Sequence, residues 1–442
     1  MKWIRAHYFG RRFFMILALV VLSFVAAFFY PALLFPAKMV FVSLVIATVA
    51  DMAMLFLVSG IEARRVAPEK LSNGDENRID IRVENWYAFP VSVEIIDELP
   101  FQFQKRDFTI PGSIPSGGTQ EHSYTVRPVE RGEYFFGALN VFASSPLRLA
   151  VRRFRFSGEI MVPVYPSIIQ MRKYDLFAVS NRLVEAGIKK IRRIGASMEF
   201  DQIRRYITGD DYRKINWKAT ARKSELMVNQ FRDERSQHVY SVIDMGRAMK
   251  MPFNAMTLLD YAINASLVIS NVAIRREDRA GIITFSDKIE AILPASREYA
   301  QMFRILELLY KCRTGFLESN YEQLYAEISR KLNRRCLLLL YTNFETLSSL
   351  RRHLPLLAMT AKRHVLVVIF FLNTELDWFI ETPAESIEEM YIKTIAEKFA
   401  FEKKQIVKEL DRHGIHSILT SPELLTVNTI NTYLELKSRG LI

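Results

Sequence analysis

The chain of 442 residues is predicted to contain two N-terminal transmembrane helices, a β-sandwich-like middle domain and a C-terminal doubly wound α/β domain. Three patterns predict this: two long apolar stretches near the amino terminus, short alternating runs at residues 62–165, and apolar strands alternating with helices after residue 239. Half of the residues are hydrophobic and 24% are charged, a balance that favours packed cores over disorder. We expect segment boundaries at 1–61, 62–165, 166–238 and 239–442.

The cysteines and the net charge restrict the class of protein. Cys312 and Cys336 lack CxxC or Cys/His spacing, so a reducing compartment is expected and a disulfide scaffold or zinc finger is not. The net charge of +12 favours anionic partners, namely acidic lipid surfaces, nucleic acid or an acidic protein. The sequence contains no GxxxxGK[ST], GxGxxG or GxSxG motif, and His413 and His416 are expected in a turn. We therefore do not expect an enzyme.

Two apolar stretches near the amino terminus are long enough to cross a bilayer. Residues 13–35 carry no charge and, at about 1.5 Å of rise per residue, span a hydrocarbon core of about 30 Å. Residues 39–61 are interrupted only by Asp51, and a short turn at residues 31–38 joins the two stretches. A signal peptide is the alternative, but the second stretch and the lack of a small-x-small cleavage site argue against it. The sequence thus predicts an antiparallel transmembrane hairpin.

The basic residues predict the orientation of this hairpin. They flank its outer ends and are scarce in its turn: Lys2, Arg5, Arg11, Arg12, Arg64 and Arg65 outside, against Lys38. By the positive-inside rule we expect a protein of the inner (plasma) membrane with two spans and cytoplasmic soluble domains. Asp51 falls near the middle of the second span, where an acid costs about 2.5–3.5 kcal/mol. It is expected either to contact a partner helix or to be tolerated in a tilted helix.

The middle segment, residues 62–165, has the pattern of a small β-sandwich. Alternating runs such as residues 79–83 and 91–95 are separated by turn residues at 72–75, 111–112 and 115–118. No combination of side chains here suggests catalysis, so we expect a structural or docking module.

After residue 239 the chain alternates strands with helices. Strands are expected at residues 239–243, 280–285, 289–293, 336–341, 365–371 and 415–419, and helices at residues 256–276, 297–312, 321–332, 344–362, 386–412 and 422–437. Several strands are apolar on both faces, as in buried parallel sheets. Ligands of such sheets bind beyond the carboxyl ends of the strands, which directs attention to Asp244, Thr342 and Asn343.

The most distinctive stretch, residues 195–226, precedes this domain. Its characteristic residues have a fixed order and spacing: Gly195, Glu199, Phe200, Arg204, Tyr206, Gly209, Asp210, Arg213, Ile215, Trp217, Ala221 and Arg222. This stretch closely resembles the signature of the domain of unknown function 58 (DUF 58) family. Residues 131–134 and 145–149 also resemble the family's Arg-Gly-x-Tyr and Asp-Pro-Phe-Gly-Leu elements, although Ser145 replaces the Asp and Arg148 replaces the Gly. The resemblance covers essentially the whole chain.

The resemblance implies a von Willebrand factor A-like fold for residues 239–442 and frequent pairing with MoxR-type AAA+ ATPases in bacteria. The residues themselves suggest a structural role, because acidic and basic side chains occur together in this segment and can form ion pairs. Residues 189–235 hold 13 Lys/Arg against 7 Asp/Glu, a net charge of +6. Glu199 and Asp210 are expected to pair with Arg204, Arg213 and Arg222 and to clamp the segment against the sheet. Trp217 and Tyr206 are expected to be apolar anchors. A partner-binding surface and, less directly, catalysis are the alternatives.

Von Willebrand A domains often hold Mg²⁺ through Asp-x-Ser-x-Ser, a later Thr and an Asp after the fourth strand. Here Gly246 and Ala248 stand at the two Ser positions after Asp244, and Asn343 stands where the later Asp would be. Ser319 or Asn320 lies near the expected Thr. Because a hard cation needs several oxygen ligands, we expect a degenerate rim with no metal or other cofactor, where Asp244 caps its loop or pairs with an Arg.

Three functions remain open. We expect a membrane-anchored protein-interaction module that works with a MoxR-type AAA+ ATPase in complex assembly or envelope-related processes, and that binds through a rim including Arg247 and Asn343. The first alternative is a metal-dependent enzyme or ligand-binding protein using Asp244. The second is binding of anionic lipid or nucleic acid by the basic segment, and the interleaved acidic residues argue against nucleic acid.

Overall fold

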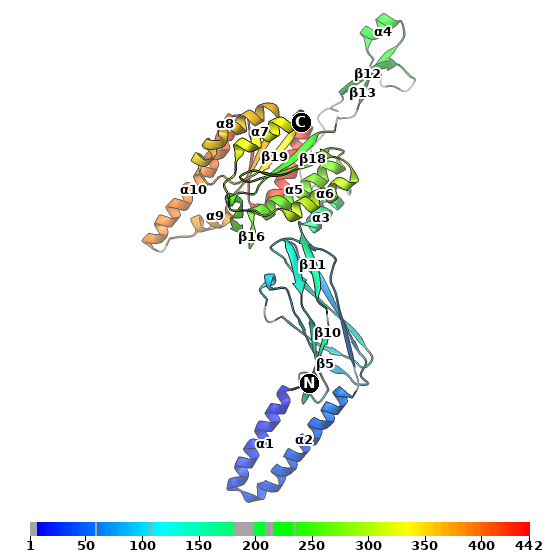
Figure 1. Ribbon diagram of the computed structural model, residues 1–442, viewed down its shortest axis with the longest axis vertical. Coiled ribbons are helices and arrows are strands. Elements are labelled where there is room, and N and C mark those ends of the chain that lie inside the picture. Colours follow the sequence, from blue (N-terminus) through cyan, green and yellow to red (C-terminus); the bar gives the residue numbers. More distant parts are fainter. Residues whose placement is uncertain are drawn as a thin grey trace. The chain divides into compact units, whose positions relative to one another are not determined.

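The computed structural model describes residues 7–57, 60–105, 108–156, 158–179, 199–207, 210, 212, 215–232, 236–384 and 386–442. The chain divides into two compact units, Met1–Tyr165 and Pro166–Ile442 (Figure 1). The first unit holds both apolar helices and the β-rich segment. The second holds the signature stretch and the C-terminal strands and helices.

Two apolar helices form a hairpin at the start of the first unit, drawn in blue in Figure 1. They are α1 (Arg11–Phe29) and α2 (Leu34–Phe56), joined by a 3₁₀ turn at Pro31–Leu33. The second helix starts before the expected residue 39, because Pro36 lies in its first turn, where proline is tolerated. Both helices are long and apolar enough to cross a membrane. Most of their side chains are exposed, whereas the buried ones on α2 recur along one face: Ala37, Leu44, Thr48, Asp51 and Leu55.

The β-rich part of the first unit has three sheets around one core. The largest is antiparallel, with the order β1 (His7–Phe9), β10 (Ala150–Phe156), β9 (Leu139–Ser144), β5 (Val91–Asp97) and β6 (Thr109–Ile114). The second comprises β2 (Ile61–Val66), β4 (Asn77–Asn85) and β7 (Thr119–Val126), and the third β3 (Leu71–Ser72), β11 (Ile160–Tyr165) and β8 (Gly132–Phe136). Alternate residues of β4 are buried, as the period of two in a strand requires. A 3₁₀ turn at Phe101–Phe103 follows β5.

A buried ion pair lies inside this β-rich core. The Arg65 guanidinium donates two hydrogen bonds to Asp97, and its remaining donors reach the carbonyl oxygens of Gly137 and Gly158 at 3.0 and 2.6 Å. The Tyr124 hydroxyl donates at 2.5 Å to Asp97 Oδ2, the oxygen that also accepts from Arg65 Nε. Burial, together with the Asp97 charge, raises the pKa of Tyr124 far above its ordinary value. The charges are tolerated because each is paired and hydrogen-bonded.

The second unit is built around a six-stranded sheet with the order β18 (Ile289–Ser296), β17 (Arg279–Phe285), β14 (His238–Asp244), β19 (Leu337–Tyr341), β20 (Val365–Phe371) and β21 (His416–Thr420). All neighbours are parallel except the edge strand β18. The six strands and six helices expected in this part of the chain are present, with ends shifted by less than one helical turn. Apolar runs on both faces therefore identified the buried strands correctly.

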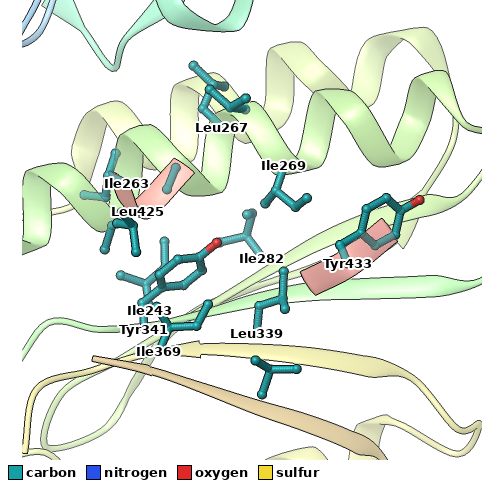
Figure 2. Packing of buried hydrophobic residues seen from close by; sticks show 14 of the residues in the cluster. Ile243, Ile263, Leu267, Ile269, Ile282, Leu339, Tyr341, Ile369, Leu425 and Tyr433 are labelled. Carbon is teal, nitrogen blue, oxygen red and sulfur yellow. The ribbon is translucent and has the colours of Figure 1, made fainter. Parts of the chain in front are cut away.

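Helices cover both faces of this sheet. One face packs against α5 (Leu258–Arg275), α6 (Tyr299–Lys311) and α11 (Leu425–Ser438), and the other against α7 (Tyr321–Lys331), α8 (Leu347–Arg363) and α10 (Ile387–Arg412). Successive strand residues alternate between the two cores, so Val242 and Ile243 face opposite sides. Figure 2 shows Leu339 and Tyr341 of β19 on the side of α5 from which Ile269 points toward the sheet.

Several short elements were not expected from the sequence. They are α3 (Ile168–Val179), β12 (Glu199–Arg205), α4 (Trp217–Lys223), β13 (Met227–Arg232), β15 (Pro252–Phe253), β16 (Met256–Thr257), α9 (Thr374–Glu381) and the 3₁₀ turns Arg247–Lys250 and Pro422–Leu424. The helix α3 is tied to α5 by Asp175, which accepts hydrogen bonds from Asn271 at 3.0 Å and Arg275 at 2.8 Å. The last helix begins after a 3₁₀ turn that follows Ser421, rather than at Pro422 itself.

Candidate functional site

Asp244 ends the central strand β14 at the carboxyl edge of the sheet and is 1% exposed. Its Oδ1 accepts from the Gly246 backbone N–H at 2.8 Å and from the Ser319 hydroxyl. Its Oδ2 accepts from Thr342 Oγ1 at 2.7 Å and from the Tyr321 hydroxyl at 3.2 Å. A carboxylate oxygen has about two acceptor positions, so the protein itself fills all four on Asp244. We call Asp244, Ser319, Tyr321 and Thr342 the hydroxyl cage.

Gly246 is what makes room for this cage. A Cβ at this position would lie 2.1 Å from Ser319 Oγ and 3.0 Å from Asp244 Oδ1. The serine of the metal-binding pattern could therefore not stand here without displacing Ser319. Ala248, at the second serine position, lies on the 3₁₀ turn Arg247–Lys250 and has no side-chain oxygen.

The electrostatics of the cage follow from its burial. Burial raises the pKa of Asp244 above its ordinary 3.8, and its hydrogen bonds from Ser319, Gly246, Thr342 and Tyr321 oppose that rise. Burial and then the Asp244 charge raise the pKa of the Tyr321 hydroxyl well above its ordinary value. The Tyr321 ring stacks on His353 with ring centres 4.3 Å apart, which holds the hydroxyl in place.

The donors of the cage do not fit a hard divalent cation. Such an ion needs several free oxygen ligands, whereas the single carboxylate here already accepts four hydrogen bonds. Asn343 Oδ1 accepts from Lys403 Nζ at 2.6 Å, which places a cation beside the rim. In the part of the chain that the structure describes, no group of three His, Cys, Asp or Glu residues is arranged to hold a metal. The expected capping of the loop by Asp244 is present, and Arg247 pairs instead with Glu318 at 3.2 Å.

Lys403 is a rim residue that sequence reasoning missed. It lies on α10, with its Nζ 5.7 Å from the centre of the Phe370 ring, and burial lowers its pKa to about 8. A signal was available, because Lys403 precedes the buried Ile406 and Leu410 by three and seven positions and so shares their face of the helix. The apolar face of α10 thus carries one amine toward the sheet edge.

The loop beside the cage presents apolar side chains to solvent. Phe316 is 64% exposed and Leu317 is 50% exposed, and Lys250 Nζ lies 3.3 Å from the centre of the Phe316 ring. The Leu317 carbonyl accepts the Arg247 N–H at 3.0 Å, which joins this loop to the turn after β14. We call Arg247, Lys250, Phe316, Leu317 and Glu318 the rim surface.

The signature stretch forms a separate hairpin of β12 and β13, with α4 between the two strands. The Arg204 guanidinium pairs with Asp210 in bidentate fashion at 2.9 and 2.6 Å, and Arg205 pairs with Glu225 at 2.7 Å. Both ion pairs join residues within the hairpin, so they do not clamp the segment against the sheet as expected. Asn216 caps α4 by accepting the Ala219 N–H at 3.0 Å.

The remaining signature residues have different environments. Trp217 is 69% exposed, so the expectation that it would be an apolar anchor is wrong; Tyr206, also expected as an anchor, is half-buried. Ile215 bridges to Val228 across the hairpin. Four others lie on these elements, namely Glu199 and Phe200 in β12, and Ala221 and Arg222 exposed on α4. The predictions for Gly195, Gly209 and Arg213 lie outside the described residues.

Asp51 is fully buried and lies near the C-terminal end of α2, whereas the sequence predicts it near the middle of the second span. Its carboxylate accepts the Ser145 hydroxyl and the backbone N–H groups of Leu149 and Ala150, the latter two at 2.9 and 2.8 Å. Asp51 lies closer to the end of the helix than predicted because α2 begins earlier in the sequence than expected. Arg148 in this loop has φ of 58°, the left-handed region where the resembled element has glycine. The carboxylate thus fixes the helix to the β-rich segment.

Comparisons with known proteins find similarity over part of the chain. Residues 202–376 match the model of a family described as "Protein of unknown function DUF58". The chain is 24% identical over 216 residues to the uncharacterized protein YeaD of Bacillus subtilis (strain 168), a match that covers 44% of this chain and 50% of that protein. The chain therefore spans about half the length of this curated relative.

Two solved domains are each similar to about a quarter of the chain. The PapD-like domain 7 of human CEP192 is 17% identical, with a TM-score of 0.19, over 24% of this chain and 84% of that domain. The CARDB domain of PF1109 from Pyrococcus furiosus is 12% identical, with a TM-score of 0.18, over 24% of this chain and 86% of that domain.

Proposed function

We propose that this chain is a membrane-anchored protein-interaction module without catalytic activity, whose von Willebrand factor A-like C-terminal domain binds a MoxR-type AAA+ ATPase. Its two spans would lie in the inner membrane, with the soluble domains in the cytoplasm and the β-rich segment as a sandwich-like spacer. The match of residues 202–376 to a DUF58 model supports the resemblance on which the partner rests.

The single observation that carries the proposal is the saturation of Asp244. A metal-dependent receptor or an enzyme that uses Asp244 needs free oxygens on this carboxylate, whereas Asp244 accepts four hydrogen bonds from fixed donors. The cage holds the loop of Ser319 to the end of β14. That arrangement favours binding through a preorganised surface over chemistry or an exchangeable ion.

The rim surface has the composition of a binding site. Exposed Phe316 and Leu317 supply apolar area, and Arg247 and Lys250 supply charge beside it. Aromatic residues and arginine are enriched at the centres of protein interfaces.

The test is capture of the AAA+ ATPase encoded in the same organism by the full-length protein in detergent. A variant with Arg247→Glu and Phe316→Ala should capture at least about tenfold less ATPase, since a buried interface residue contributes about 1–2 kcal/mol or more to the free energy of binding. Tyr299→Ala is the matched control, because Tyr299 is a fully exposed aromatic residue at the start of α6. Equal capture by the rim variant and the control would show that the partner binds elsewhere.

A further inference from the structure

Three exposed arginines lie at the start of α1 or on the loop whose backbone contacts it. Arg11 and Arg12 are the first residues of the helix, and the backbone of Arg148 contacts Gly10, which directly precedes them. The Gly10 N–H donates to the Leu149 carbonyl at 2.8 Å, and a Cβ on Gly10 would lie 2.2 Å from the Arg148 carbonyl oxygen. All three arginine side chains are exposed.

These guanidinium groups have no carboxylate partner among the residues that the structure describes. Arg148 donates to the Ser92 hydroxyl at 2.9 Å, which is a neutral acceptor. The nearby Asp51 is buried, and its carboxylate is already occupied by Ser145 and two backbone N–H groups. The positive charge at this end of the hairpin is therefore not compensated by the described part of the chain.

Exposed apolar side chains adjoin the same arginines. Tyr8 and Phe9, on the strand before α1, are 43% and 47% exposed, and Leu147 on the loop is 48% exposed. Phe14 begins the exposed apolar surface of α1, about 4.5 Å along the helix axis from Arg11. Leu149 packs between the helices against Val20 and Leu44, so the loop reaches the membrane helices themselves.

We propose that Arg11, Arg12 and Arg148 bind the phosphate groups of anionic phospholipids at the membrane surface. The inference rests on the proposed membrane anchoring. Arginine side chains extend from the border of the hydrocarbon toward headgroups, and their planar forks match phosphate oxygens. Tyrosine is enriched at the same depth of the bilayer. We call the three arginines with Tyr8, Phe9 and Leu147 the juxtamembrane patch.

The chemistry selects this occupant over a protein. The patch lies at the end of helices whose exposed surface is apolar, so lipid surrounds it once the hairpin is inserted. Each basic residue near an anionic surface contributes about fivefold to binding, so the three together contribute about 100-fold.

The experiment uses the full-length protein in a non-ionic detergent, titrated with phosphatidylglycerol, with phosphatidylcholine or with inorganic phosphate, and read by native mass spectrometry. The wild type should bind phosphatidylglycerol about 100-fold more tightly than the variant Arg11→Gln, Arg12→Gln, Arg148→Gln. Both should bind phosphatidylcholine equally, and free phosphate should not compete. The matched control replaces Arg78, Arg82 and Arg127, three exposed arginines of the β-rich segment, by Gln and should bind as the wild type does.

Equal affinity of the patch variant and the wild type for phosphatidylglycerol would overturn the proposal. So would loss of a co-purifying protein from the patch variant with no change in lipid preference, because the occupant would then be a protein. Alkaline carbonate extraction of membranes separates the two hypotheses. Release of the wild type would contradict the anchoring itself, whereas retention of both proteins with equal lipid affinity would contradict only the patch.

Discussion

Replacing Gly246 by Ala should destabilise the second unit by displacing one hydroxyl. The new Cβ would stand 2.1 Å from Ser319 Oγ, so this hydroxyl must leave its hydrogen bond to Asp244. A hydrogen bond to a charged group contributes about 1.5–3 kcal/mol. Gly246 has φ of −70°, which alanine adopts freely, and the stiffer unfolded chain returns about 0.4–1 kcal/mol. The net loss is about 1–2 kcal/mol.

A double-mutant cycle isolates this mechanism. Ser319→Ala alone should cost about 1.5–3 kcal/mol, since Asp244 loses the same donor. Once the Ser319 hydroxyl is removed, the Cβ added by Gly246→Ala meets only Asp244 Oδ1 at 3.0 Å and the Leu317 carbonyl oxygen at 3.1 Å. In that background Gly246→Ala should not lower the free energy of unfolding further. We therefore expect the double variant to be about 1–2 kcal/mol more stable than the sum of the two single losses predicts, and this difference is the coupling energy.

The assay is thermal unfolding of the full-length protein in detergent, followed by circular dichroism. For a unit of this size, 1 kcal/mol corresponds to about 2–4 °C in Tm, so Gly246→Ala should lower Tm by about 2–8 °C. Tyr299→Ala serves as the exposed control and should leave Tm unchanged. Additive losses in the double variant would refute the account, because the two substitutions would then act independently.

Three further outcomes are expected. Burial raises the pKa of Asp244 above 3.8, so the folded state keeps this proton to higher pH than the unfolded state does, and stability falls as the pH rises above 3.8. The variant Asp244→Asn should remove that part of the decline, which a series of Tm measurements from about pH 4 upward would show. Burial lowers the pKa of Lys403 from 10.5 to about 8, so stability should rise between these values, and Lys403→Met should flatten the Tm profile there. Arg65→Met leaves the buried Asp97 unpaired and should reduce the free energy of unfolding in urea by about 3–5 kcal/mol, while the exposed Arg82→Met should cost less than about 1 kcal/mol.

The sequence predicted the main strands and helices of the second unit because each of them can be recognised from the pattern of its own residues. Strands such as Val365–Phe371 are apolar on both faces and bounded by polar turns, which makes them readable one segment at a time. The starts of helices also follow local rules, as at Ser386, whose hydroxyl accepts the Glu389 N–H at 3.1 Å. The short α9 and the strand β1 were missed because neither is long enough to show a period.

The contacts of the candidate sites depend on residues far apart in the chain. Asp51 meets the loop of Ser145 some 94 positions later, and no periodicity encodes that distance. The sequence predicts three of the four cage residues as site candidates. Asp244 and Ser319 come from the comparison with a metal-binding pattern and Thr342 from its place after a strand, whereas Tyr321 is not predicted. Its hydroxyl reaches Asp244 because the ring stacks on His353 of α8, a tertiary contact. The prediction for Trp217 was wrong because an aromatic residue in a distinctive motif suggests a buried position, whereas this side chain is exposed.

Pairing between β1 and β10 constrains how the chain is made. The strand before the first apolar helix, His7–Phe9, is completed only by residues 150–152, which follow the second helix. Two segments of one sheet cannot lie on opposite sides of a bilayer, so any inserted form must have an even number of crossings between them. During synthesis the leading strand waits for a partner that leaves the ribosome more than a hundred residues later, and the hairpin must already have turned back by then.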